Sequence, residues 1–330
     1  MTSPQTPPQD STEPPGLAAH GMLSMLFAGL ESAEQRQDRP AAAVLMLITW
    51  LGFIGISGAH LGKPWPTVLG WIPGPLLFAL GVALLLSTTL RLWSRRPALA
   101  RLALMLGAYL LGNLLSGLAH QWLEPSRGVA ALNAVASGFI LSRLIYASAV
   151  ALPMWLVYRL AFGDRSDFHL GLGRWSPHTR LGRHDRPRPW YLILAGFAVF
   201  VAVPVFVFMQ AQVDFGPWHS GRLLALALPL LLMALANAFA EELLFRGLMQ
   251  GASIHALGAA WGIWMVGLVF GLHHYQASFE TLASLPTALL LGAGSVLFAK
   301  SVVETRGLAW SVCAHAMINM GLFSAYYVAS

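Results

Sequence analysis

The sequence predicts an all-α fold, a polytopic transmembrane helical bundle of about nine helices, with eight as the alternative count. Of the 330 residues, 56% are hydrophobic and only 10% are charged, and the mean hydropathy is +0.62. This composition excludes a soluble globule of ordinary surface polarity, and 12 Trp and 17 Phe are too much apolar surface for a disordered chain. Apolar segments long enough to cross roughly 30 Å of hydrocarbon recur along the chain.

We expect residues 1–40 to form a disordered or interfacial cytoplasmic tail. The stretch from Pro4 to Pro15 is rich in proline, and the chain lacks the basic start and apolar run that a cleavable signal peptide requires. Residues 16–30 place apolar side chains at helical spacing but are too few to span a bilayer. They predict an interfacial helix.

The predicted spans begin after Pro40 and fall into two groups. Residues 41–160 hold four accessory helices, residues 161–189 form an Arg-rich cytoplasmic loop, and residues 190–330 hold five further helices. Arg143 lies near the middle of one span, so it either faces the interior of the bundle or marks a misplaced span. The nine spans are 41–60, 66–89, 98–121, 129–158, 190–210, 223–250, 258–276, 284–303 and 308–329.

The distribution of basic residues predicts the orientation. With the tail inside, fifteen Lys and Arg fall on the inner side and three fall on the outer side, and cytoplasmic loops retain positive charge during insertion. The protein is therefore expected to be a multi-pass protein of the plasma (inner) membrane of a bacterium, with a cytoplasmic N-terminus. The net charge of +6 follows from this topology, so we expect membrane lipid as a partner and no nucleic acid.

Two adjacent carboxylates stand out because every other Asp and Glu is predicted to lie in a tail or loop. Glu241 and Glu242 fall inside a span, where a carboxylate costs several kcal/mol unless it is paired or hydrated. Glu242 and Arg246 are at i and i+4 in the favourable order, so they should pair. Glu241 is rotated about 100° away, lacks such a partner on its own helix, and is freer to point into a cavity. The alternative interpretation is a purely structural ion pair.

Two further clusters contain histidine, a good general base or metal ligand near neutral pH. His274 follows Phe270 by four residues, and His315 and Asn319 share one helix face at i and i+4. Taken singly, either histidine is more often a hydrogen-bonded residue of helix packing. His274 and Glu241 can share a water only if the first helix continues to about Gln250, with a kink at Gly247 or Gly271 closing the remaining gap.

Together the three motifs resemble the CAAX protease and bacteriocin-processing (CPBP) family of intramembrane endopeptidases. Glu-Glu-x-x-x-Arg, Phe-x-x-x-His and His-x-x-x-Asn follow in this order within residues 220–325, whereas the first 190 residues carry none of the family's motifs. The resemblance implies that residues 190–330 form an intramembrane protease core. It also implies that Glu241 activates a water, that His274 helps to bind or polarise it, and that Glu242 and Arg246 hold the site together.

For the third motif, the resemblance implies that His315 and Asn319 stabilise the oxyanion. His273 stands where the family usually has an apolar residue. It lies about 100° away from the presumed active face, so we interpret it as a packing residue or a water contact.

The implied activity is an endopeptidase, similar to CAAX prenyl protease 2, that hydrolyses a peptide bond of a membrane-associated or lipidated protein or peptide. We expect no cofactor to be required, although Glu241, His274 and His315 could bind a catalytic zinc with water as the fourth ligand. One alternative is a non-catalytic membrane scaffold or bacteriocin immunity factor on the same fold. A second is an ion- or proton-coupled transporter, although the sequence lacks the inverted repeats common in carriers.

Overall fold

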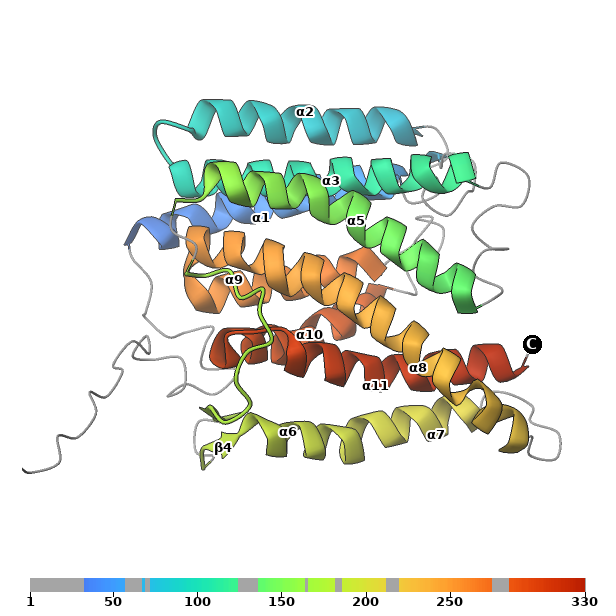
Figure 1. Ribbon diagram of the computed structural model, residues 1–330. Coiled ribbons are helices and arrows are strands. Elements are labelled where there is room, and N and C mark those ends of the chain that lie inside the picture. Colours follow the sequence, from blue (N-terminus) through green and yellow to red (C-terminus); the bar gives the residue numbers. More distant parts are fainter. Residues whose placement is uncertain are drawn as a thin grey trace, which may run out of the picture.

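The computed structural model describes residues 33–56, 67–68, 72–123, 136–163, 166–181, 186–211, 220–274 and 285–329 (Figure 1). Within these residues the protein is an all-α bundle, as predicted. Two short antiparallel ribbons accompany the helices, β1 (Thr67–Val68) with β2 (Ile72–Pro73) and β3 (His178–Thr179) with β4 (Arg188–Pro189). The predicted interfacial helix of residues 16–30 and the tail up to residue 32 lie outside the described residues.

The N-terminal group consists of α1 (Ala33–Ile56), α2 (Gly74–Leu92), α3 (Pro97–Leu123) and α5 (Ala136–Ala161). Helix α1 begins eight residues before the predicted span, so the prediction of a tail is wrong for residues 33–40. Asp38, also predicted to lie in the tail, is buried and forms an ion pair with Arg96. The guanidinium of Arg39 lies 4.5 Å from the centre of the Trp261 ring. These charged groups anchor the first turns of α1 to other helices, which composition could not reveal.

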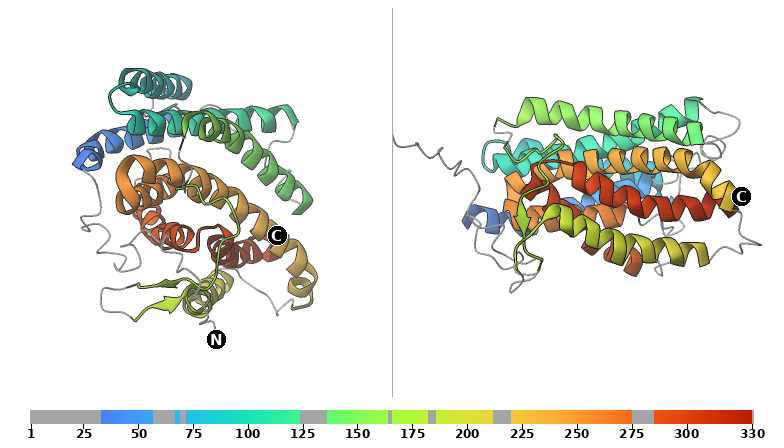
Figure 2. Two further views of the ribbon diagram at one scale, coloured as in Figure 1. Left: turned by 60° about the vertical axis from the view of Figure 1, so that its left-hand side comes forward. Right: turned by 60° about the horizontal axis from the view of Figure 1, so that its bottom comes forward.

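The C-terminal group contains three successive helical segments. The first consists of α6 (Trp190–Phe197), the π-helix η3 (Ala198–Ala202) and α7 (Val203–Ala211). It lies on the far side of the group from the N-terminal helices (Figure 2). The second runs through α8 (Ser220–Glu242), the π-helix η4 (Leu243–Met249) and α9 (Gln250–His274), and the third comprises α10 (Leu285–Thr305) and α11 (Ala309–Ala329).

A reversal inside α9 sets the depth of the motif residues. Gly258 has φ 78° and ψ 166°, a backbone conformation that residues with a Cβ rarely adopt, so the chain turns back there. The helix from Ser220 thus continues to Leu257, seven residues beyond its predicted end. Glu241 lies seventeen residues before Gly258 and His274 sixteen residues after it, which places both at a similar depth.

The kink predicted at Gly247 or Gly271 is therefore wrong, because the reversal lies at Gly258. Both glycines instead allow close packing. A Cβ at Gly247 would lie 2.8 Å from the Leu170 side chain, and one at Gly271 would collide with the backbone of α10.

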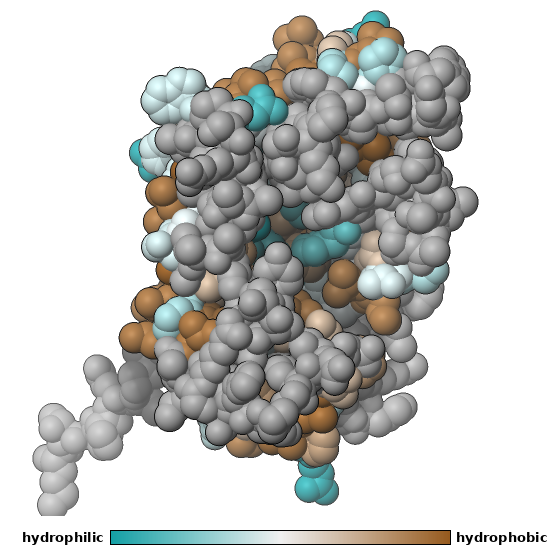
Figure 3. Space-filling view, turned by 90° about the vertical axis from the view of Figure 1, so that its right-hand side faces the viewer, coloured by the Kyte–Doolittle hydropathy of each residue, from teal (hydrophilic) through white to brown (hydrophobic). Residues whose placement is uncertain are grey.

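Seven helices of the described residues are long and apolar enough to cross a membrane. The prediction of nine spans differs because Leu226–His274 counts once although it folds back at Gly258, and because α11 is not among the seven. Large apolar side chains face outward, including Leu160 at 85% and Phe200 at 81% exposure. Figure 3 shows brown apolar residues along the flanks and hydrophilic residues in a central hollow. The protein is an integral, multi-pass membrane protein.

The described part of the Arg-rich segment packs across one end of the bundle, on the left in Figure 1. The Arg174 amide donates to the Thr305 carbonyl at 2.7 Å, and the Leu308 amide donates to the Gly171 carbonyl at 2.8 Å. Lys300 and Glu304, predicted to be charges of the inner loops, lie inside α10 and pair with each other, and Lys300 is fully buried. The described parts of this segment are therefore anchored to the turn between α10 and α11.

Candidate active site

Helix α8 ends on the two adjacent carboxylates, and the π-helix η4 follows them directly. Segments of π-helix are rare and frequently occur at functional sites. Arg246 Nη1 lies 3.1 Å from Glu242 Oε1, the pairing that the spacing predicts, and both side chains are buried at 1% and 0% exposure. The Arg246 guanidinium also lies 4.1 Å from the centre of the Phe270 ring. The charge of a buried carboxylate is thus balanced by a cation that itself packs against the ring of another helix.

Glu241 has a partner on its own helix, which corrects the expectation that it has none. The Asn237 side-chain amide, one turn earlier in α8, donates to Glu241 Oε1 at 3.0 Å. Among the described residues, the other carboxylate oxygen, Oε2, accepts no hydrogen bond. The Nε2 atoms of His274 and His315 lie 3.6 Å and 3.7 Å from this oxygen.

The same hydrogen-bonding pattern orients both histidines. His274 Nδ1 lies 2.9 Å from the Phe270 carbonyl oxygen, and His315 Nδ1 lies 2.8 Å from Glu242 Oε1. Because both partners are acceptors, Nδ1 carries the proton in each ring, a tautomer assigned from the hydrogen-bond network. The Nε2 atoms, from α9 and α11, are then left to act at Glu241.

A cavity of about 500 Å³ opens beside these residues. Asn319, one turn after His315 in α11, is 4% exposed, and its amide makes a long 3.5 Å hydrogen bond to the Ala234 carbonyl. Glu241 does not itself line the cavity, but its partners do. The polar lining consists of Asn237, Glu242, Arg246, His274, Ser295, His315 and Asn319, and the remaining walls are mostly apolar. The structure therefore brings the six predicted site residues together.

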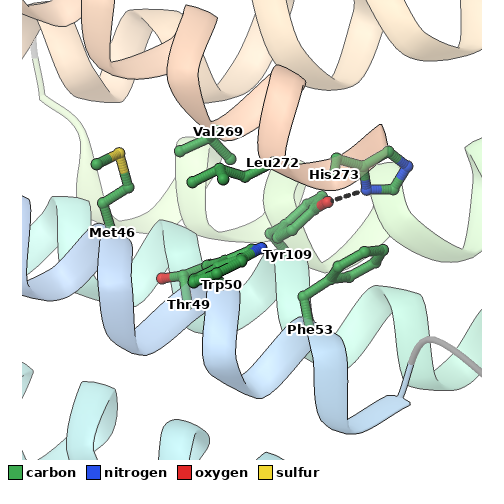
Figure 4. Close-up of a pocket in the computed structure, with 8 residues that line it drawn as sticks. All are labelled: Met46, Thr49, Trp50, Phe53, Tyr109, Val269, Leu272 and His273. Carbon is green, nitrogen blue, oxygen red and sulfur yellow. Dashed lines mark hydrogen bonds between the residues drawn. The ribbon is translucent and has the colours of Figure 1, made fainter. Parts of the chain in front are cut away.

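Sequence reasoning missed Asn237, although an amide four residues before Glu241 in an apolar run was a usable signal. It also left His273 without a defined partner. The Tyr109 hydroxyl of α3 lies 2.5 Å from His273 Nδ1 (Figure 4). The Tyr146 hydroxyl of α5 lies 3.5 Å from Nε2. The Phe53 ring of α1 lies 4.6 Å from the His273 ring.

Through these contacts, three of the N-terminal helices pack against the residue next to His274. His273 precedes His274 directly, so α1, α3 and α5 hold the end of α9 that carries a motif residue. The prediction of a packing role for His273 is confirmed, and its hydrogen-bond partners are tyrosines. A small cavity of about 10 Å³ lies beside His273 and Tyr109.

Arg143, which the sequence left unexplained, lies within α5 and near the carboxylates. Its guanidinium is 4.9 Å from the centre of the Phe139 ring, and its charge interacts with Glu241. Helix α5 packs directly on α8 and η4. Of the two interpretations, the structure supports an arginine that faces the interior of the bundle.

We compared the chain with known protein families, with curated proteins and with solved structures. The family model described as "Type II CAAX prenyl endopeptidase Rce1-like" matches residues 223–321, a range that contains all six predicted site residues. Comparisons with curated proteins and with solved structures give no match. Residues 223–321 are thus similar to the Rce1-like type II CAAX prenyl endopeptidases of the CPBP family, the same membrane proteases that the three motifs resemble.

Proposed function

We propose that the protein is an intramembrane endopeptidase in which Glu241 activates the attacking water. The observation that carries this proposal is the approach of three groups to one point. Glu241 Oε2 lies 3.6 Å from His274 Nε2 and 3.7 Å from His315 Nε2. Both distances are too long for direct hydrogen bonds, yet a water between the groups could donate one hydrogen bond to Glu241 Oε2 and the other to the unprotonated Nε2 of His274.

In the proposed reaction, Glu241 removes a proton from this water while the water oxygen attacks the carbonyl carbon of the scissile peptide bond. His274 holds the water through Nε2. Glu241 then passes the proton to the leaving nitrogen, the C–N bond breaks, and a new carboxyl group and a free amine are released. A general base must lie within hydrogen-bond reach of the proton it removes, and the position of Glu241 supports this role.

We assign His315 and Asn319 to the developing oxyanion. Both line the cavity from one face of α11. The Asn319 amide donates as it stands, whereas His315, whose Nδ1 proton goes to Glu242, donates from Nε2 as an imidazolium that Glu242 balances; both donors would stabilise negative charge on the substrate oxygen. Glu242 acts through His315, because its carboxylate holds Nδ1 and so orients the ring. Arg246 in turn balances the charge of Glu242.

We further propose that the reaction needs no metal. Glu241, His274 and His315 have the chemistry of a zinc site. The proposed mechanism instead assigns Glu241 and His274 to the water and His315 to the oxyanion. No step of the proposed mechanism therefore uses a metal, and elemental analysis of the purified protein tests this.

For the substrate, we propose a membrane-associated or lipidated protein or peptide, such as one with a prenylated C-terminal CAAX sequence. The family description names prenyl substrates, and the mostly apolar walls of the cavity would accept a lipid or apolar side chains. The partners would then be membrane lipid and a peptide chain, with no nucleic acid. We also propose a cytoplasmic N-terminus in a bacterial inner membrane, which reporter fusions at each end can test.

The test is cleavage of S-farnesylated CAAX peptides and a membrane-peptide library by the purified full-length protein, followed by mass spectrometry. Glu241→Gln is the matched control, because it keeps the size and the hydrogen bond from Asn237. We expect cleavage by the wild-type protein, with or without a chelator, and none by the variant. Wild-type protein that cleaves no peptide, or a Gln variant that cleaves normally, would refute the proposal.

A further inference from the structure

We propose that Thr179, Arg186 and Arg188 bind the C-terminal carboxylate of the peptide substrate. This inference rests on the proposed protease function. A second cavity, of about 580 Å³, lies between α6 and the β3–β4 ribbon. It shares wall residues with the cavity at the carboxylates and histidines, namely Leu181, Phe197, Val201 and Leu297. The two cavities therefore adjoin at this wall, and we propose that together they form one passage for the substrate.

The second cavity is polar at one end and apolar along the rest. Arg186, Arg188 and Thr179 come from the ribbon and the chain beside it, whereas α6 and η3 contribute side chains such as Leu192, Ile193 and Phe200. A matching ligand has an apolar body and a polar end. The polar end must be anionic, because the side chains that meet it include two guanidinium groups.

Thr179 provides an independent sign of a ligand. Its side chain is 1% exposed, lines the cavity, and has an Oγ1 without a hydrogen-bond partner among the described residues. A buried hydroxyl is usually hydrogen-bonded, so this one calls for an explanation. In the ribbon Thr179 is the register partner of Arg188, which places the hydroxyl and one guanidinium side by side across the strands.

The two arginines are available for an anion. The ion pairs found among the described residues include neither Arg186 nor Arg188. A guanidinium presents paired donors that match the two oxygens of a carboxylate, and such charge-assisted bonds are about twice as strong as neutral ones. Two arginines and one hydroxyl can satisfy both oxygens of a single carboxylate.

The passage connects this anion site to the proposed reaction. Phe197, shared by both cavities, lies seven residues after Trp190 along α6, and β4 ends at Pro189, directly before that helix. The rise of an α-helix puts the arginines on the order of 10 to 15 Å from the shared wall. An extended peptide covers that distance with roughly three to four residues. A substrate whose C-terminal residues extend from the shared wall into the second cavity would thus place its carboxylate at Arg186 and Arg188.

The test uses two versions of one S-farnesylated CAAX peptide, ending in a free carboxylate or in a carboxamide. Wild-type protein should show a kcat/KM for the acid roughly 10- to 100-fold above that for the amide, through KM, as expected for loss of a hydrogen bond to a charged group. In the R186Q/R188Q protein this ratio should fall toward one. In R91Q/R95Q, which removes the same charge from exposed positions at the end of α2 and in the turn after it, the ratio should stay at the wild-type value.

Binding of the released tripeptide to the Glu241→Gln protein, measured by calorimetry, separates this inference from the protease function. Tighter binding of the acid than of the amide, lost in R186Q/R188Q, supports the site even if no peptide is cleaved. Cleavage of both peptides at equal KM overturns it. A second outcome would also overturn it. If R186Q/R188Q changes kcat/KM equally for both peptides, and only in nanodiscs that contain phosphatidylglycerol, then the arginines bind a lipid headgroup.

Discussion

Replacing Arg246 with Met should destabilise the hairpin of α8, η4 and α9, which folds back at Gly258 and carries Glu241, Glu242 and His274. Methionine preserves the unbranched aliphatic part of the arginine side chain but lacks the guanidinium, whose Nη1 lies 3.1 Å from Glu242 Oε1. Glu242 is buried apart from the cavity that it lines, and the hydrogen bond from His315 is what it retains among the described residues. Removing one partner of a buried ion pair costs about 3 to 5 kcal/mol.

The expected result in detergent is an apparent Tm lowered by on the order of 10 °C, because each kcal/mol corresponds to roughly 2 to 4 °C in a large domain. Peptidase activity should fall as well, since Glu242 also orients His315. Thermal unfolding followed by intrinsic tryptophan fluorescence measures the first effect. Arg91→Met, at an exposed position of α2, is the matched control and should keep the wild-type Tm.

A double variant separates charge from packing. In Glu242→Gln/Arg246→Met the buried carboxylate is absent, so the double variant should be more stable than Arg246→Met alone. If both variants lose the same stability, the loss comes from the packing of Arg246 on Phe270 and not from an unpaired charge. If Arg246→Met keeps the wild-type Tm, the ion pair between Glu242 and Arg246 does not contribute to the stability of the protein.

Four further predictions concern the catalytic groups. Glu241→Gln should abolish hydrolysis with an unchanged Tm, because the neutral amide cannot act as a base; normal turnover in peptide assays would refute that role. Asn319→Ala should lower kcat about 10²- to 10³-fold at constant KM, and full activity would exclude it as an oxyanion donor. His315→Ala should leave the zinc content measured by elemental analysis unchanged, and loss of bound zinc would instead identify a ligand. Tyr109→Phe, which removes the hydroxyl 2.5 Å from His273, should lower kcat severalfold while sparing KM, whereas an unchanged kcat would make that hydrogen bond irrelevant to the reaction.

Relations within one helix were readable from the sequence because the helical period decides which side chains share a face. The pairing of Glu242 with Arg246 and the common face of His315 and Asn319 follow from spacings of four residues. The membrane class followed from composition, since about 20 apolar residues in succession have few other uses. The same period could have identified Asn237, one turn before Glu241, as its partner.

Relations between helices depended on the tertiary structure. The reversal at Gly258 brings Glu241 and His274 to one depth, and the sequence predicted a kink elsewhere. Asp38 was expected in the polar tail and Lys300 among the charges of the inner side, but both are buried, Asp38 with its compensating charge in the turn between α2 and α3. The tyrosines at His273 lie more than a hundred residues earlier in the chain.

The same division holds for the proposed carboxylate site. The sequence shows Thr179, Arg186 and Arg188 as members of a basic loop, which topology alone explains. Their position at one end of a passage to Glu242, His274 and His315 depends on the β3–β4 ribbon and on α6. Local spacing determines which residues a helix presents together, because its geometry repeats. Which presented faces meet is decided by the packing of segments distant in sequence, because no repeating pattern encodes their contacts.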